Sequence, residues 1–137
     1  MSGLNNLMGR GVIPPVVHGV LDYSLAAVLL VLPFVLDFDK AATWIAFVFG
    51  IGAAVLAVGT AWSTGIVRVI PPLLHGYADV AVTVALIVLP FIVGFRDDAT
   101  ALVFYVIVGA GGLVAKLATR FEPRTPGESR MMLRPAA

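Results

Sequence analysis

Four long apolar stretches follow one another along the chain, at residues 16–36, 41–62, 73–93 and 99–117. Each is close to the ~20 residues that an α-helix needs to cross ~30 Å of hydrocarbon. The stretches are apolar on every side, whereas strands of a membrane β-barrel are about ten residues long and alternate polar with apolar positions. The pattern therefore predicts an all-α bundle of four transmembrane helices.

The last two stretches repeat the first two. The segment Ile13–Gly19, which reads IPPVVHG, returns 57 residues later as IPPLLHG at Ile70–Gly76, and identities at this offset continue to Gly52 and Gly109. Each copy is predicted to be a tight helical hairpin. Because a hairpin crosses the membrane twice, both copies begin on the same side. The two tandem repeats are therefore parallel, with a pseudo-twofold axis along the membrane normal.

The repeats define a single membrane domain, residues 13–120. Repeat one spans 13–63 and repeat two spans 70–120. Residues 1–12 are expected to form a cytoplasmic N-terminal segment, and residues 121–137 a basic, disordered cytoplasmic tail, because arginines there are interleaved with proline and glycine.

Composition and charge place this domain in a membrane. Of the 137 residues, 60% are hydrophobic and 12% are charged, which is far from the balance of soluble proteins. Basic residues gather on the side that holds both termini and the central loop: Arg10, Arg68, Lys116, Arg120, Arg124, Arg130 and Arg134. Only Lys40 and Arg96 fall on the other side. Both termini are therefore expected in the cytoplasm, with lipid as the surrounding partner and no nucleic acid.

Small residues recur at helical spacing in the second and fourth stretches and predict where helices pack. The pattern is Ala42, Ala46, Gly50 and Ala54 in the second stretch and Gly111 and Ala115 in the fourth, and Gly52 and Gly109 are also predicted to pack helices. Small side chains let backbones approach closely in lipid. The same stripes are equally suited to a dimer interface.

Four polar residues inside the predicted membrane spans are the candidates for chemistry: His18, Asp22, His75 and Asp79. Each His–Asp pair is four residues apart and shares one helix face. One interpretation is structural, in which buried hydrogen bonds tie the helices together. The alternatives are a metal site, with His18 and His75 among the ligands, a haem held by the two histidines, or a proton-conducting site.

No catalytic set stands out elsewhere in the chain, and without cysteine there is neither a thiol nucleophile nor an iron–sulfur ligand. The sequence therefore favours a non-enzymatic membrane protein that acts as a homo-oligomer or as an accessory subunit of another membrane protein. No catalytic residue and no obligatory cofactor are predicted.

Three segments of the chain are similar to the motifs of a known family: HGVLDY at 18–23, PFVLDF at 33–38 and the joining GIVRVIP at 65–71. They resemble those of the SPW-repeat family of small bacterial membrane proteins, and the resemblance covers about residues 12–118. Where the family has Ser-Pro-Trp, this chain has Leu-Pro-Phe in both copies. The resemblance implies a bacterial integral membrane protein with a repeat architecture, and it implies no activity. We expect this four-helix bundle in the inner membrane.

Overall fold

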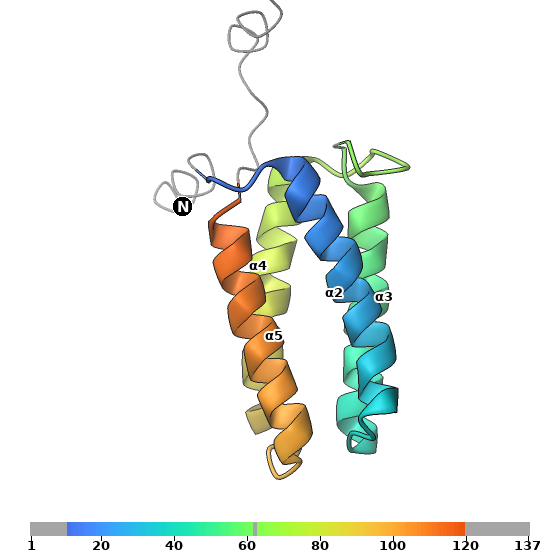
Figure 1. Ribbon diagram of the computed structural model, residues 1–137, viewed down its shortest axis with the longest axis vertical. Helices are drawn as coiled ribbons and strands as arrows, with labels where there is room; N and C mark the ends of the chain where they lie inside the picture. The colour runs from blue at the N-terminus through green and yellow to red at the C-terminus, as the bar shows by residue number, and fades with distance from the viewer. Residues whose placement is uncertain (1–10, 62, 120–137) are drawn as a thin grey trace, which may run out of the picture.

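The structure, a computed structural model, describes residues 11–61 and 63–119. The helices, labelled as in Figure 1, are α2 (Pro15–Val35), α3 (Lys40–Gly59), α4 (Pro72–Leu89) and α5 (Ala99–Leu117), with a π-helical turn, η1 (Pro90–Gly94), that prolongs α4. All four spans are long and apolar enough to cross a membrane. The predicted all-α fold with four membrane-spanning helices is confirmed.

The helices pair as two hairpins, α2 with α3 and α4 with α5. Figure 1 shows both short hairpin turns at one end of the bundle; the start of α2, the α3–α4 connection and the end of α5 lie at the other. We call these the turn end and the terminal end. Both hairpins therefore start from the same side, as parallel repeats do. The predictions for the N-terminal segment and the basic tail fall almost wholly on residues 1–10 and 120–137, which lie outside the described residues.

Proline and aspartate set where the helices begin. Pro15 and Pro72 occupy the first helical position of α2 and α4, where the missing N–H breaks no hydrogen bond. Asp39 and Asp98 cap α3 and α5, and each carboxylate accepts from a backbone N–H of the first turn, at 3.1 and 3.0 Å. Asp98 also accepts from the backbone N–H of Asp39 at 2.7 Å, which joins the two hairpin turns.

The two hairpin turns are equivalent at their start and differ at their end. Asp37 and Gly94, 57 residues apart, both have positive φ, at 53° and 94°, and the phenylalanines that follow them, Phe38 and Phe95, are both buried. Asp98 then follows Phe95 by three residues, whereas the first-copy cap follows Phe38 directly. The second turn is therefore two residues longer than the first.

This difference changes the register of the repeat. In α2 and α4 the buried positions correspond at an offset of 57 residues, as the sequence identities predict. In α3 and α5 they correspond at 59: Ala42 with Ala101, Ala46 with Tyr105, Gly50 with Gly109, Ala57 with Lys116, and Thr60 with Thr119. Gly109 therefore takes the place of Gly50 in the bundle, and not that of Gly52.

The glycines predicted to pack helices divide into two classes. A Cβ on Gly50 would lie 2.8 Å from a leucine side chain of α2, and one on Gly109 would lie 2.6 Å from an isoleucine side chain of α4, so both allow close helix contact within a hairpin. A Cβ on Gly52 or Gly111 would meet nothing within 4 Å. Two residues further along a helix point about 200° away, so Gly52 and Gly111 pack against no helix among the described residues.

Aromatic contacts and one buried hydrogen bond join the hairpins near the turn end. The rings of Phe38 and Phe104 lie edge to face with centroids 5.1 Å apart. The hydroxyl of Tyr105, a fully buried residue, donates to the backbone carbonyl of Ala42 at 2.6 Å. Polar contacts between the hairpins at the terminal end are of a different kind and form the candidate site.

Candidate functional site

The four intramembrane polar residues meet between the hairpins. His18 and Asp22 come from α2, and His75 and Asp79 come from the equivalent turn of α4. One ligand atom from each residue lies within 4.8 Å of the other three. All four residues are at least 94% buried. The structure therefore brings together every residue that the sequence singled out for chemistry, in one compact cluster, which we call the His–Asp quartet.

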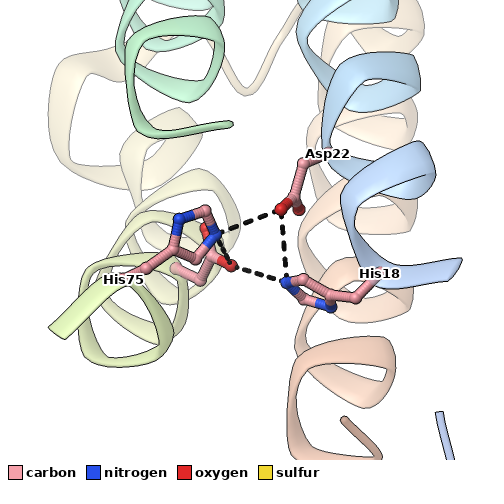
Figure 2. Close-up of side chains that lie close together, drawn as sticks. His18, Asp22 and His75 are labelled. Atoms are coloured by element: carbon pink, nitrogen blue, oxygen red, sulfur yellow. Dashed lines mark hydrogen bonds and ion pairs between the residues drawn. The ribbon is translucent and has the colours of Figure 1, made fainter. Parts of the chain in front are cut away.

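Histidine and carboxylate atoms alternate around the quartet, as Figure 2 shows in part. His18 Nε2 lies 3.3 Å from Asp22 Oδ2 and 3.0 Å from Asp79 Oδ2. His75 Nε2 lies 3.1 and 2.8 Å from the same two oxygens. Each imidazole thus contacts the carboxylate of its own helix and that of the other hairpin. The pairs are not self-contained within a helix, and the quartet links the two repeats.

A fifth residue, Lys116 near the end of α5, completes the charge cluster. It is 3% exposed, and its ammonium donates to Asp22 Oδ1. The same Nζ lies 2.9 Å from Asp79 Oδ2 and 3.4 Å from His18 Nε2. Lys116 therefore brings one positive charge to a site that holds two carboxylates.

Two threonines hold the outer ring nitrogens. The Thr119 hydroxyl oxygen lies 2.8 Å from His18 Nδ1, and that of Thr60 lies 2.5 Å from His75 Nδ1. Each hydroxyl donates its single proton to the backbone carbonyl four residues earlier, at 2.7 and 2.6 Å. Toward histidine the oxygen can then only accept. We therefore assign the ring proton to Nδ1 in both histidines, which leaves Nε2 as the atom that faces the carboxylates.

The inner face of the quartet requires a further positive charge. Asp22 Oδ2 is buried and accepts no hydrogen bond from the described residues, although both histidine Nε2 atoms lie within 3.3 Å of it. A neutral imidazole with its proton on Nδ1 presents only a lone pair to this oxygen, and the hydrogen bond between His18 Nε2 and Asp79 Oδ2 at 3.0 Å likewise requires a proton on Nε2. Two lone pairs at this distance repel unless a cation lies between them. A proton or a metal ion supplies that cation.

A haem does not fit this arrangement. Axial ligation by two histidines requires a flat macrocycle between the rings. The centroids of His18 and His75 are 5.8 Å apart with an interplanar angle of 73°, and Figure 2 shows the Asp22 carboxylate reaching between the two rings. Asp79 Oδ2 contacts both Nε2 atoms as well. The carboxylates therefore fill the place that the porphyrin would need.

The bundle interior between the quartet and the turn end is apolar. Its described buried side chains include Ala26, Leu29 and Leu86. The three buried hydroxyls on this path, of Thr43, Thr83 and Tyr105, donate to backbone carbonyls. No buried carboxylate, histidine or lysine of the described residues continues the quartet across the bundle. This geometry favours a binding site near the terminal end over a path that conducts protons through the membrane.

Sequence reasoning missed three residues of the site. From the sequence, Lys116 is counted only among the basic residues that indicate the cytoplasmic side. A lysine within an apolar span is itself a signal of an intramembrane partner. Thr60 and Thr119 carry no such signal. Their equivalence appears only at the offset of 59 residues, which the sequence identities at 57 conceal.

Fold and site together define a multi-pass helical membrane protein with a buried ionisable centre between two hairpin repeats. The family model for the SPW repeat domain matches residues 16–119. The chain therefore belongs to the SPW repeat family, as its motifs indicate. No match was found among curated proteins or among solved structures.

Proposed function

We propose that this chain is a non-enzymatic protein of the bacterial inner membrane, with both termini cytoplasmic, whose His–Asp quartet binds one divalent transition-metal ion. The observation that carries the proposal is the arrangement of two imidazole nitrogens and two carboxylate oxygens, from both hairpins, around one point. Imidazole and carboxylate are ligands that zinc and its neighbours in the first transition row accept.

The spacing of the ligand atoms supports a small metal ion. A tetrahedral zinc site with bonds of about 2.0–2.1 Å has edges of about 3.3–3.4 Å between ligand atoms. The four contacts between Nε2 and Oδ2 atoms are 2.8 to 3.3 Å long. Outward movements of a few tenths of an ångström would open these four edges. The other two distances, between the two Nε2 atoms and between the two Oδ2 atoms, are at most 4.8 Å. They would have to shorten toward the tetrahedral edge, which requires the four atoms to move out of a common plane.

The surroundings of the histidines also suit metal ligation. Metal-binding histidines commonly donate their other ring N–H to a fixed oxygen, which sets the tautomer and the ring orientation. Thr119 and Thr60 provide such oxygens for His18 and His75. A metal with four protein ligands has no open coordination position, which is typical of structural sites and not of catalytic ones. The quartet thus supports a metal that links the hairpins without catalysis.

Metal content provides the direct test. Purified in detergent with zinc present and then desalted, the wild-type protein is expected to carry about one zinc per chain. Cobalt in its place should give the intense visible absorption of a tetrahedral site. Asp22→Asn keeps the shape of the side chain and removes one anionic ligand, so it should lose both signals. Asp98→Asn, at the opposite end of the bundle, is the matched control and should keep them.

Two results would overturn the metal proposal. One is a folded wild-type protein that takes up neither zinc nor cobalt at stoichiometric concentration. The other is equal uptake by wild-type protein and by Asp22→Asn. Helical circular dichroism and a monodisperse elution profile establish in each case that the protein tested is folded.

The orientation is proposed from the charge distribution. By sequence, seven lysines and arginines fall on the side of the terminal end, whereas Lys40 and Arg96 fall at the turn end, where they stand among aspartates. An excess of lysine and arginine marks the cytoplasmic side. A cysteine introduced at Ile66 should therefore resist an impermeant thiol reagent in intact cells, and one introduced at Asp97 should react with it. The reverse pattern would invert the proposed topology. Assembly as a homo-oligomer or with another membrane protein stays a prediction.

A further inference from the structure

Lys116 contacts the same carboxylates that a bound metal would use as ligands. Its Nζ donates to Asp22 and lies 2.9 Å from Asp79 Oδ2, and it also lies 3.4 Å from His18 Nε2. A metal held by these ligands at about 2 Å would place a double positive charge within a few ångströms of the ammonium. Like charges at such a distance in a low-dielectric interior repel strongly. The ammonium and the metal therefore compete for the same carboxylates.

Lys116, unlike the four ligands, has no counterpart in the other repeat. His18 and Asp22 have symmetry mates in His75 and Asp79, and Thr119 has its mate in Thr60. Lys116 has none, because Ala57 stands at the equivalent position of α3. The four ligands and the residues that orient them are complete without a lysine. Lys116 is thus an addition to one half of a symmetric site.

From these contacts we propose that Lys116 is a built-in competing cation that sets the metal affinity of the quartet. Without metal its ammonium neutralises part of the carboxylate charge. When a divalent metal binds, the ammonium leaves the carboxylates and the metal takes over their charge. This inference rests on the proposed metal-binding function and adds a regulating residue to it.

The structure offers the lysine a place to move. A groove of about 270 Å³ lies between α2 and α5; it begins at His18 and Lys116 and runs toward the turn end as far as Val28 and Ile107. Small side chains on α5 leave this groove open. Lys116 is the penultimate residue of α5, at the terminal end. From there a long side chain can keep its stem along apolar surface and extend its ammonium to the membrane interface.

Labelling of the wild-type protein tests the movement without a mutation. The sequence contains two lysines, Lys40 and Lys116, and Lys40 is exposed at the turn end. A lipophilic amine-acylating reagent, added to the protein in micelles, should modify Lys40 with or without zinc. It should modify the buried Lys116 at least about fivefold faster once stoichiometric zinc is added. Zinc binding with no change at Lys116 would overturn the displacement.

Zinc affinity tests the competition. Lys116→Met keeps the length of the side chain and removes its charge, so this variant should bind zinc at least about tenfold more tightly than wild type in competition with a chelating dye. Lys40→Met is the matched control and should bind as wild type does. Weaker or unchanged zinc binding by Lys116→Met would show that the lysine supports the ligands instead, and would refute this inference while leaving the metal site in place. Absence of zinc binding by both wild type and Lys116→Met would refute the metal site itself, and the inference with it.

Discussion

Removal of the threonine hydroxyls that orient the histidines is the sharpest test of the assigned tautomers. In Thr119→Val the side chain keeps its shape, but the Nδ1–H of His18 loses the oxygen that accepts from it at 2.8 Å. Thr60→Val does the same to His75 in the other half of the site. Because the two contacts are related by the pseudosymmetry, the two variants should behave alike.

The size of the effect follows from burial. His18 and Thr119 are both fully buried, so no water replaces the lost partner, and a buried donor left without an acceptor costs about 1–3 kcal/mol of folding stability. Loss of the residue that orients a metal-binding histidine typically weakens the metal by about 10–100-fold, or about 1.4–2.8 kcal/mol. Both variants should therefore unfold earlier and bind zinc more weakly.

The assay is zinc competition with a chelating dye, combined with thermal unfolding in the same detergent. Thr43→Val serves as the control, because Thr43 is also buried and its hydroxyl also donates to a backbone carbonyl, yet it lies near the turn end, away from the quartet. It should keep wild-type zinc affinity. Wild-type affinity in Thr119→Val and Thr60→Val as well would refute the assignment of the ring protons to Nδ1.

Three further predictions concern the bundle itself. Tyr105→Phe should lower unfolding stability by about 1 kcal/mol in detergent, because its hydroxyl donates to a backbone carbonyl of α3 across the hairpins. Gly109→Ala should lower the unfolding stability by about 1–3 kcal/mol, since its Cβ would meet side-chain and backbone atoms of α4 at 2.6 and 2.9 Å. Gly52→Ala should be neutral or stabilising by up to about 1 kcal/mol, because its Cβ would meet nothing within 4 Å. Equal effects of the two variants would contradict the close packing of α5 against α4 at Gly109. The pKa of Asp98 is lowered from 3.8 because its carboxylate accepts hydrogen bonds from the backbone N–H groups of Ala101 and Asp39. The folding stability that this carboxylate contributes is therefore fully present above about pH 4 and is lost as the pH falls through the lowered pKa. Asp98→Asn should therefore lose less folding stability than wild type when the pH is lowered.

The sequence was sufficient for the class of fold because lipid imposes simple requirements. A span must be about 20 apolar residues long and must satisfy its own backbone hydrogen bonds, and both conditions are readable from composition and length. Proline at the start of α2 and α4 and aspartate before α3 and α5 mark helix starts by local chemistry. These features depend on neighbours in the chain and need no knowledge of the partner helix.

The candidate site was predictable only in part. His18, Asp22 and their repeats were visible as polar residues in apolar spans, and the repeat implied that they lie at one depth. Their contact depends on the rotation of α2 and α4 about their axes, which packing against α3 and α5 sets. The sequence pattern also placed Gly52 and Gly111 among packing residues, but of these four glycines Gly50 and Gly109 alone meet a neighbouring helix in the described part of the chain.

The sequence by itself determined that this protein has four membrane-spanning helices in two parallel hairpins, because hydrophobic length and internal repetition are properties of the chain alone. The tertiary structure alone decided that the second turn adds two residues and shifts α5 relative to α3. At 1.5 Å and 100° per residue, that shift moves and rotates the helix enough to change which side chains face inward. It directs Thr119 to His18 and Lys116 to the carboxylates, contacts that join residues about a hundred positions apart.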